Sequence, residues 1–512
     1  MRASMATIDP FEMVLADEQA TLKLAAEIAP LLQPGDVVAL WGGLGAGKTT
    51  FARALIRARA GDPRLDVPSP TFTLVQSYEL ASGTVVHADL FRLRHPEDLR
   101  ELGWPELAED AVLLLEWPER AGPLLPAGRL DIALALAPEL GPEHRRLRIA
   151  ASGPTAERMR SLIAFKRFLQ EAGYAEAERI PIQGDASTRI YERLKRGPHG
   201  AILMIAPRRP DGPPVRNGRP YSAIAHLAED VVPFVALARA LRARGLSAPD
   251  IYAADLAEGL LILEDLGTEP IVSGNPPEPV MDRYAAAVDA LTALHAQVMP
   301  DTLPVAPGVD YRIPPYDLDA LMIEVELLPE WYLPHQGSEL AADAREEFVG
   351  LWQEALRPAA AAQRVWVLRD FHSPNLLWLP DRAGVARVGI LDFQDAVMGP
   401  AAYDLVSLLQ DARVDVPPAA EDALLGRYMK ARHAAGRQFD MPEFVNLYAL
   451  MGAQRATKIL GIFARLDRRD GKPHYLRHLP RVWRNLRRSL SDPTLASLKK
   501  WYDRHVPPPR PT

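Results

Sequence analysis

The sequence predicts two domains of different class, an α/β domain followed by a bilobal α+β domain. Up to about residue 150, short apolar runs alternate with stretches of helical periodicity, which is typical of α/β proteins. Beyond that point a hairpin-rich part is followed, from about residue 281, by a mostly helical part. A chain of 512 residues is long enough for several domains of roughly 150 residues each. Glycine and proline in "ASGPTAE" mark the junction, and we expect the α/β domain at 1–152, a linker at 153–159 and the second domain at 160–512.

The elements of the first domain follow from its apolar runs. The run at 36–42 predicts a strand, and a tight turn connects it to a helix predicted at 48–60. Four further runs predict strands, the last two as a closing antiparallel pair: 83–91, 110–118, 129–137 and 145–151.

Composition narrows the classes of function. The chain has 0 cysteines, which excludes thiolate and disulfide chemistry and favours a reducing compartment. Its first residues include acidic side chains and no apolar segment of signal-peptide type. No apolar run approaches the ~18 residues that span a bilayer. We therefore expect a soluble cytoplasmic protein, and no Cys/His cluster suggests zinc.

Charge is distributed unevenly along the chain. Residues 1–150 hold 15 basic against 21 acidic side chains, so this part lacks the basic footprint of a nucleic-acid-binding domain. Residues 451–512 hold 15 basic against 4 acidic side chains. This basic end either meets an anionic partner or forms a solvated, arginine-rich helical face, and both interpretations stay open.

A phosphate-binding motif lies between the first predicted strand and helix. Gly42, Gly47, Lys48 and Thr49 match G-x-x-x-x-G-K-[ST] in the context that this motif requires. Glycines let backbone N–H groups surround phosphate oxygens at a helix N-terminus, while the lysine reaches the β/γ-phosphates and the threonine hydroxyl binds Mg²⁺. We therefore predict a P-loop NTPase domain whose ATP-binding residues include Gly42, Gly43, Gly45, Ala46, Gly47, Lys48, Thr49 and Thr50.

Two carboxylates follow predicted strands of the same domain. Asp89 ends the strand "HADLF" and Glu116 ends "LLLEWP". A carboxylate at such a place holds Mg²⁺ directly or through water. The alternative for Asp89 is a strand-end cap. We expect Lys48 and Glu116 to carry catalysis, with Thr49, Asp89 and Glu116 at the metal.

The motif set of this domain resembles one family. The stretches "GGLGAGKTTF", "SPTFTLV", "HADLFRL", "ELGW" and "EWPER" are similar to the small TsaE-type ATPase of the bacterial tRNA threonylcarbamoyl-adenosine system, over roughly residues 8–152. The resemblance implies that ATP hydrolysis drives the cycle of partner subunits and that tRNA is involved only indirectly. It also implies that Thr71 is a switch residue, that Glu18 lies near the nucleotide and that Trp117 lies beside the metal carboxylate. Gly43 departs from the family, which commonly has Asp there.

A second site is predicted in the C-terminal part. "VLRDFHSPN" contains Asp370 and Asn375 with the spacing D-x-x-x-x-N, and Asp392 follows an apolar strand 17 residues after Asn375. Phosphoryl transfer to an alcohol needs these parts: one Asp orients the acceptor hydroxyl, while the Asn and the second Asp hold Mg²⁺. We give His372, inside the same loop, no acid–base role.

This part resembles aminoglycoside-phosphotransferase-like kinases over about residues 160–505. The stretches that carry the resemblance are "GDASTRIY", "LILEDLG", "RDFHSPNLLWL", "LDFQDAVMGPAAYDLVSLLQDAR" and "QRATKILGIFARL". Within these kinases it is similar to the branch that phosphorylates the anomeric hydroxyl of N-acetylmuramic acid and N-acetylglucosamine in cell-wall recycling. The resemblance implies a bilobal protein-kinase-like fold, a hinge at 260–267 whose backbone pairs with adenine, and a phosphate-covering loop at 184–194. The expected ATP contacts are Ser187, Arg189, Glu264 and Leu266.

The second domain departs from the broad superfamily at two places. Leu368 stands where a His often precedes the catalytic Asp, and Met204 and Ile205 stand where the small lobe normally has a phosphate-contacting lysine. Arg189 and Arg193 are the candidates for the missing charge.

Four further residues of this domain carry predictions. We expect Asp395 to contact substrate or support Asp392, and Asp404 to anchor the loop. Arg455 and Lys458, one helical turn apart, face either an anionic sugar or solvent.

The sequence therefore predicts a bifunctional fusion that uses ATP and Mg²⁺. Its expected partners are the subunits of the tRNA threonylcarbamoyltransferase complex and an amino-sugar substrate. We expect no membrane partner. Three alternatives remain: a regulatory pseudokinase, a kinase for another small alcohol such as an aminoglycoside or choline-like compound, and an NTPase with an unrelated client.

Overall fold

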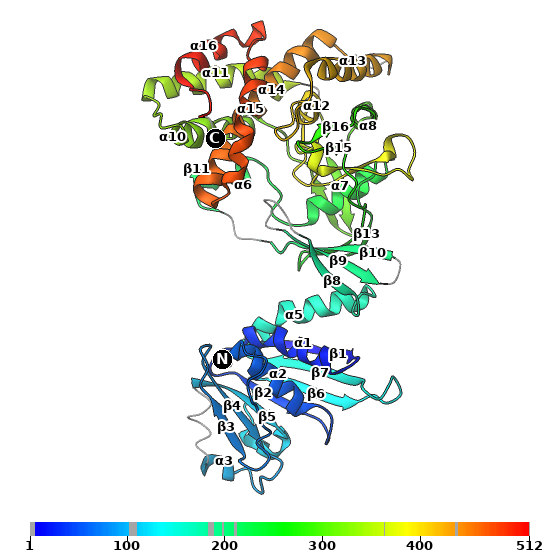
Figure 1. Cartoon of the computed structure of the whole chain (residues 1–512), viewed down its shortest axis with the longest axis vertical. Helices are drawn as coiled ribbons and strands as arrows, with labels where there is room; N and C mark the ends of the chain where they lie inside the picture. The colour runs from blue at the N-terminus through cyan, green and yellow to red at the C-terminus, as the bar shows by residue number, and fades with distance from the viewer. Residues whose placement is uncertain are drawn as a thin grey trace. The chain divides into compact units, whose positions relative to one another are not determined.

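The computed structural model describes residues 6–101, 110–182, 189–196, 199–208, 212–362, 364–435 and 439–510. The chain divides into two compact units, Met1–Ala175 and Glu176–Thr512 (Figure 1). Among the described residues, no helix combines the length and the apolar character needed to cross a membrane.

The first unit is built on a seven-stranded sheet with the order β1-β7-β6-β2-β5-β4-β3. Its centre is parallel, from β6 through β2 and β5 to β4, and the remaining neighbours pair antiparallel. The strands are β1 (Thr7–Leu15), β2 (Val37–Trp41), β3 (Val75–Tyr78), β4 (Thr84–Asp89), β5 (Ala111–Glu116), β6 (Leu130–Leu136) and β7 (Arg145–Ser152). The predicted α/β class and the closing antiparallel pair β6–β7 are confirmed.

Both faces of this sheet carry an apolar core. Alternate residues of the central strands enter different clusters: Val38 and Leu114 join one, and Val37 and Leu113 join the other. Burial on both faces explains the continuous apolar runs of the sequence. The helical segments of the unit are α1 (Glu18–Ile28), η1 (Ala29–Leu31), α2 (Lys48–Ala60), α3 (Asp98–Glu101), η2 (Pro118–Leu124) and α5 (Pro154–Glu171).

Helix α5 occupies the segment where the sequence predicted a linker at 153–159. Pro154 is at the first helical position, where its missing N–H and fixed φ favour a helix start. Ala156, Met159 and Ile163 then bury one face of α5 in the core that contains β1 and β7. The division between the units consequently falls after Ala175 rather than near residue 152.

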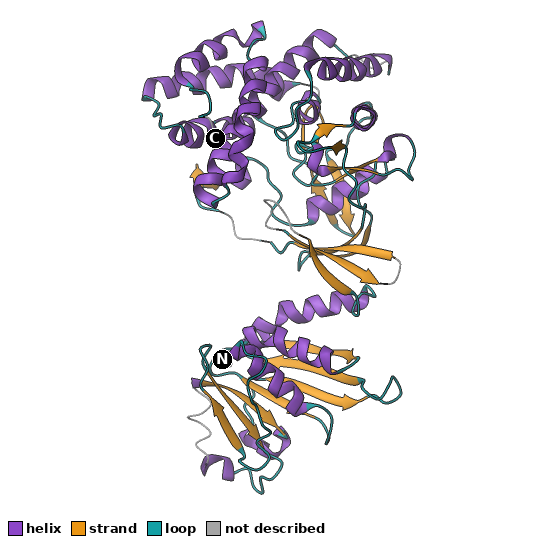
Figure 2. Cartoon of the chain, in the orientation of Figure 1, coloured by secondary structure: helices purple, strands orange, loops and turns teal. Residues whose placement is uncertain are grey.

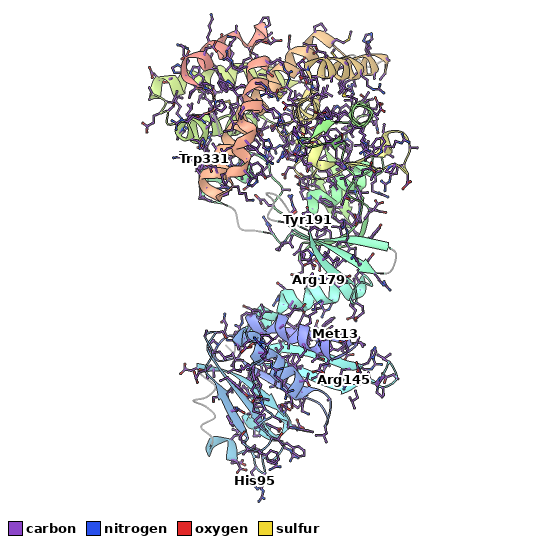
Figure 3. The ribbon with its side chains drawn as sticks, viewed as in Figure 1. Met13, His95, Arg145, Arg179, Tyr191 and Trp331 are labelled. Atoms are coloured by element: carbon purple, nitrogen blue, oxygen red, sulfur yellow. The ribbon has the colours of Figure 1, made fainter. Side chains whose placement is uncertain are left out.

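The second unit combines a five-stranded antiparallel sheet, β13-β14-β10-β9-β8, with a helical part (Figure 2). The sheet strands are β8 (Glu178–Ile182), β9 (Ile190–Arg196), β10 (His199–Ile205), β13 (Ile251–Asp255) and β14 (Leu260–Glu264). Arg179 on β8 and Tyr191 on β9 belong to this sheet (Figure 3), and Arg179 pairs with Glu192 at 2.6 Å.

The described part of the second unit also contains five two-stranded ribbons. They are β11 (Pro214–Arg216) with β12 (Arg219–Pro220), β15 (Val272–Ser273) with β16 (Glu278–Pro279), β17 (Thr302–Ala306) with β18 (Val309–Arg312), β19 (Arg364–Val367) with β22 (Val397–Pro400), and β20 (Leu376–Trp378) with β21 (Val388–Ile390). The last two ribbons carry the predicted catalytic loop between β19 and β20, and Asp392, which is two residues beyond the end of β21.

The helical part confirms the predicted two-lobed α+β class. Its α-helices are α6 (Tyr221–Ile224), α7 (Val232–Arg242), α8 (Met281–His295), α9 (Leu318–Val325), α10 (Leu333–His335), α11 (Ala342–Ala361), α12 (Ala402–Leu409), α13 (Pro418–Ala434), α14 (Met441–Asp470), α15 (Leu479–Ser489) and α16 (Ala496–His505). Short segments η3 (Leu328–Tyr332), η4 (Ser373–Asn375), η5 (Gly384–Arg387), η6 (Pro473–His478) and η7 (Pro493–Leu495) join them.

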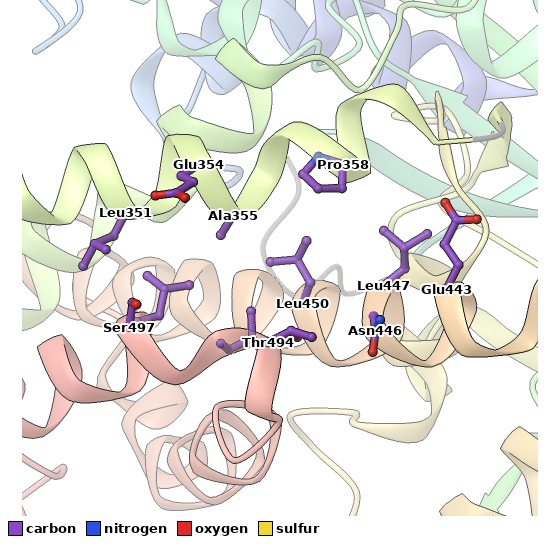
Figure 4. Close-up of a pocket in the computed structure, with 12 residues that line it drawn as sticks. Leu351, Glu354, Ala355, Pro358, Glu443, Asn446, Leu447, Leu450, Thr494 and Ser497 are labelled. Carbon is purple, nitrogen blue, oxygen red and sulfur yellow. The ribbon is translucent and has the colours of Figure 1, made fainter.

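A cavity of about 390 Å³ lies between α11, α14 and the segment that leads into α16 (Figure 4). Leucine side chains such as Leu351, Leu447 and Leu450 form much of its wall, with Glu354 and Glu443 on it as well. The predicted catalytic residues are not part of this lining, so we do not assign the cavity to catalysis.

Candidate nucleotide and phosphotransfer sites

The loop between β2 and α2 has the backbone of a phosphate cradle. Gly42 and Gly47 have φ angles of 135° and 105°, which favour glycine. A Cβ atom at Gly42 would lie 2.2 Å from the carbonyl oxygen of Leu134, so the neighbouring strand β6 excludes a side chain there. Helix α2 begins at Lys48, and its first N–H groups complete the cradle.

Lys48 is buried beneath this loop. Its Nζ donates hydrogen bonds to the carbonyl oxygens of Gly42 and Gly43, at 2.7 and 2.9 Å, and lies 3.8 Å from the ring centroid of Trp117. Burial lowers the pKa of Lys48, and the negative charges of Glu116 and Asp89 act in the opposite direction. The ammonium is therefore held at the loop by two backbone carbonyl groups, with the Trp117 ring beside it.

Thr49 and Glu116, predicted at the metal, are brought together. The Thr49 hydroxyl donates to Glu116 Oε2 at 2.9 Å, and Glu116 Oε1 lies 3.0 Å from His87 Nε2. Asp89 is directly opposite Glu116 in the parallel register of β4 and β5. One hydroxyl and two carboxylates are hard oxygen donors, and this set suits Mg²⁺ that completes its shell with nucleotide phosphates and water.

Asp89 also has the structural role that the sequence left open. Its Oδ1 accepts the N–H of Phe91 at 3.0 Å, which caps the strand end, and its Oδ2 accepts the Thr71 hydroxyl at 2.8 Å. Thr71 thus links the predicted switch segment to the strand end. Glu18 is exposed at the start of α1, and its placement near the nucleotide stays a prediction.

Sequence reasoning missed His87. This side chain is fully buried and contacts a predicted metal carboxylate. The available signal was strand periodicity, because His87 and Asp89 are two residues apart on β4 and therefore face the same side of the sheet.

In the second unit, the predicted catalytic loop is held by helix α12. Asp404 accepts the N–H groups of Leu368 and Arg369 at 2.7 and 2.9 Å, as expected for an anchor. Ser407 donates to the Arg369 carbonyl at 3.1 Å. Arg369 has a φ of 67°, an unusual conformation for a non-glycine residue, and these contacts fix it directly before Asp370. Burial raises the pKa of Asp404 to about 7, and the two N–H donors oppose that shift.

Asp370 is surrounded by positive charge. Its Oδ1 lies 3.6 Å from His372 Nε2 and 3.8 Å from Arg455 Nη2, and 36% of its side chain is exposed. Burial acts to raise the pKa of Asp370, yet the nearby His372, with the charges of Arg455 and Lys458, holds it well below its usual value. The carboxylate stays ionised and can accept a hydrogen bond from an alcohol.

Asn375 and Asp392 meet beside Asp370, as their spacing predicted. Asn375 Nδ2 lies 3.0 Å from the Asp370 carbonyl and 3.5 Å from Asp392 Oδ2. Asp392 Oδ1 accepts hydrogen bonds from Gln394 at 2.7 Å and from Arg189 at 3.3 Å. An amide oxygen and a carboxylate at this place fit Mg²⁺ bound to ATP phosphates.

The structure separates the two candidates for the missing lysine charge. Arg189 reaches Asp392, whereas Arg193 pairs with Asp265 at 2.7 Å. Met204 is buried on β10 with an exposed fraction of 1% and adds no charge. Ser187, also predicted to contact ATP, lies outside the described residues.

At the predicted hinge, side chains hold the backbone in place. Glu264 accepts hydrogen bonds from Arg242 at 3.1 Å and from Arg382 at 2.5 Å. Leu266 is buried. These contacts occupy the Glu264 side chain, which leaves the backbone for the expected adenine pairing, and that pairing stays a prediction.

The solvated face considered for Lys458 is contradicted by its burial, while a contact with a sugar stays a prediction. Lys458 is buried, and its Nζ donates to Glu324 Oε1 at 2.8 Å. Glu324 also accepts from Arg369, from Gln454 at 2.9 Å and from Tyr316 at 2.5 Å. Burial opposes ionisation of Glu324, but Lys458 and Arg369 lower its pKa to about 2.

Arg455 and Asp395 are also held by the protein. Arg455 is 6% exposed, which contradicts a solvated face, and its Nη1 donates to the Arg369 carbonyl at 3.1 Å. Asp395 accepts the Ala228 N–H at 2.7 Å and so fixes the loop before α7. A contact of either residue with substrate stays a prediction.

Comparisons with known proteins agree with this division of the chain. A family model described as "Threonylcarbamoyl adenosine biosynthesis protein TsaE" matches residues 15–145, and one described as "Phosphotransferase enzyme family" matches residues 178–443. The N-acetylmuramate/N-acetylglucosamine kinase of Caulobacter vibrioides is 42% identical over 353 residues, which cover 66% of this chain and 95% of that protein. The kinase of the same name from Pseudomonas aeruginosa is 36% identical over 63% of this chain and 87% of that protein. The tRNA threonylcarbamoyladenosine biosynthesis protein TsaE of Rickettsia felis is 39% identical over 26% of this chain and 76% of that protein.

Proposed function

We propose a two-part function for this chain, which belongs to the TsaE family through its first unit and to the phosphotransferase enzyme family through its second. It is a bifunctional enzyme that hydrolyses ATP in one unit and transfers phosphate to an alcohol in the other. Our proposal concerns the acceptor, the partners and the residues that do the work.

In the second unit, the convergence of Asp370, Asn375 and Asp392 carries the proposal. Asp370 accepts a hydrogen bond from the acceptor hydroxyl and aims its oxygen at the γ-phosphorus of ATP. A new O–P bond forms, the bond to the ADP oxygen breaks, and the hydroxyl proton passes to Asp370. Asn375 and Asp392 hold Mg²⁺, which neutralises phosphate charge when bound. This assembly disfavours the regulatory pseudokinase.

Arg189 supplies the phosphate-contacting charge that Met204 and Ile205 do not provide. Its guanidinium lies 3.3 Å from Asp392, at the place where phosphates meet the metal ligands. A guanidinium is always charged and binds phosphate with two parallel donors, so it can replace a lysine ammonium there.

The proposed acceptor is the anomeric hydroxyl of N-acetylmuramate or N-acetylglucosamine, supported by the names of the kinase relatives. The full chain is incubated with ATP, Mg²⁺ and either sugar, with kanamycin as the alternative alcohol, and ADP release and sugar phosphate are measured. We expect transfer to the sugars that Asp370→Asn abolishes. Transfer to kanamycin alone would contradict the sugar assignment.

In the first unit, the pairing of Thr49 with Glu116 under the phosphate loop carries the proposal. Lys48 exchanges the Gly42 and Gly43 carbonyls for phosphate oxygens, and Glu116 orients the metal shell or the attacking water. The proposed partners are the subunits of the tRNA threonylcarbamoyltransferase complex, with tRNA contacted only through them. Two measurements test this assignment: whether the chain co-purifies with those subunits in a nucleotide-dependent way, and whether they change its rate of ATP hydrolysis. An unchanged rate of ATP hydrolysis in their presence would contradict the assignment.

A further inference from the structure

Strand β4 buries an imidazole next to the metal carboxylate of the first unit. His87 has an exposed fraction of 0%, and its Nε2 lies 3.0 Å from Oε1 of Glu116, which is 2% exposed. The two side chains come from neighbouring parallel strands, β4 and β5. A hydrogen bond between groups so well shielded from water is stronger than the same contact at the surface.

Stability alone does not explain a histidine at this place. Its other ring nitrogen, Nδ1, is buried and has no hydrogen-bond partner among the described residues. When the Nε2–H group donates a hydrogen bond to the carboxylate, Nδ1 is a buried acceptor without a partner, which destabilises the fold. Leu114 lies opposite His87 in the register of β4 and β5, and an apolar side chain at 87 would pack there without an unpaired acceptor.

The hydrogen bond does control the orientation of Glu116. One carboxylate oxygen accepts from Thr49 at 2.9 Å, and the other is bound to His87 at 3.0 Å. With both oxygens held, the carboxylate plane cannot rotate. The oxygen that faces Thr49 is therefore kept at the end of the phosphate loop, where the threonine hydroxyl would meet Mg²⁺.

We propose that His87 is a positioning residue for the metal–nucleotide site: it donates from Nε2 to Glu116 and thereby fixes the carboxylate that completes the Mg²⁺ shell. The inference rests on the proposed ATPase function of the first unit. Partners that orient metal ligands from outside the shell typically change metal affinity about 10- to 100-fold when they are lost.

The test compares two substitutions in the full chain. His87→Leu removes the donor, while His87→Gln keeps an N–H group near the position of Nε2. Val86→Ala creates a cavity on the other face of the same strand and controls for general destabilisation. Binding of a fluorescent ADP analogue is titrated with Mg²⁺ and repeated in EDTA, and melting curves establish that each variant folds. The signal that Lys48→Ala removes is assigned to the first unit, because the second unit also binds nucleotide.

We expect His87→Leu to weaken the apparent Mg²⁺ affinity about tenfold or more, with nucleotide affinity in EDTA unchanged. His87→Gln and Val86→Ala should stay near the wild type. Wild-type Mg²⁺ affinity in His87→Leu would overturn the inference, as would equal losses in His87→Leu, His87→Gln and Val86→Ala. If the wild type itself shows no Mg²⁺-dependent signal that needs Lys48, the proposed ATPase function fails, and the inference fails with it.

Discussion

At the scale of single residues, Arg189 is the side chain that we propose to replace the phosphate-contacting lysine in the second unit. Arg189→Met should lower kcat/KM for sugar phosphorylation by about 100-fold, because a donor aimed at developing charge is worth that much in a shielded site. Arg193→Met is the matched control, since Arg193 is engaged with Asp265. Steady-state kinetics with varied ATP measure both. Equal losses in the two variants would contradict the assignment.

Glu324 is the buried centre of a charge network next to the catalytic loop. Glu324→Gln leaves Arg369 and Lys458 without their counter-charge, and we expect it to lower the free energy of unfolding by about 3–5 kcal/mol. Glu330→Gln, at an exposed pair with Arg345, should cost no more than about 1 kcal/mol. Urea unfolding of the full chain measures both losses.

The same network has a defined pH dependence. The folded pKa of Glu324, about 2, is below its ordinary value of 4.5. Its stabilisation is therefore fully present above about pH 4.5 and is lost as the pH falls towards 2. The difference in unfolding free energy between wild type and Glu324→Gln should shrink over that window. A constant difference would contradict the assigned charge state.

These residues mark where sequence reasoning succeeds and where it cannot. Asp370, Asn375 and Asp392 were predictable because one short loop and one strand end place them. Lys458 was not, because its partner Glu324 is 134 residues away in the chain. Arg189 and Arg193 are both arginines of one short segment. Only their partners Asp392 and Asp265, which are far away in the sequence, distinguish them.

At the scale of elements, helix α5 is part of the first unit rather than a connection. Arg158 binds both oxygens of the buried Asp36 at 2.5 Å, and Thr155 donates to the same carboxylate at 2.7 Å. Sequence reasoning took Gly153 and Pro154 as chain breakers, whereas in the fold the proline starts a helix. The partner Asp36 is 122 residues before Arg158, so local pattern could not indicate the contact.

We expect Arg158→Ala to destabilise the first unit by about 3 kcal/mol, because it leaves a buried carboxylate without its cation. Arg160→Ala, exposed on the same helix, should change stability by less than about 0.5 kcal/mol. Thermal melts that resolve the transition of the first unit measure the difference. Equal melting temperatures would mean that α5 does not hold that unit together.

At the scale of the whole molecule, two units with separate cores each carry a set of residues predicted to act on ATP. The phosphate loop, Thr49 and Glu116 belong to the first unit, and Asp370 and Asp392 belong to the second. Motifs and family resemblance therefore predicted the pair of activities well, since each activity depends on residues within one fold.

This separation predicts that the two chemistries are lost independently. Lys48→Ala should abolish ATP hydrolysis by the first unit and leave sugar phosphorylation within about twofold of the wild type, because the effects of substitutions in independent sites usually add. Asp370→Asn should do the reverse, with a loss of sugar phosphorylation of about 10²–10⁴-fold, as expected when a positioned proton acceptor is removed. Two assays are run on the same preparations: release of phosphate in the absence of sugar, and formation of sugar phosphate in its presence. If Lys48→Ala also slows sugar phosphorylation strongly while the second unit keeps its melting temperature, nucleotide turnover in the first unit regulates the kinase, and the fusion is a coupled device rather than two independent enzymes.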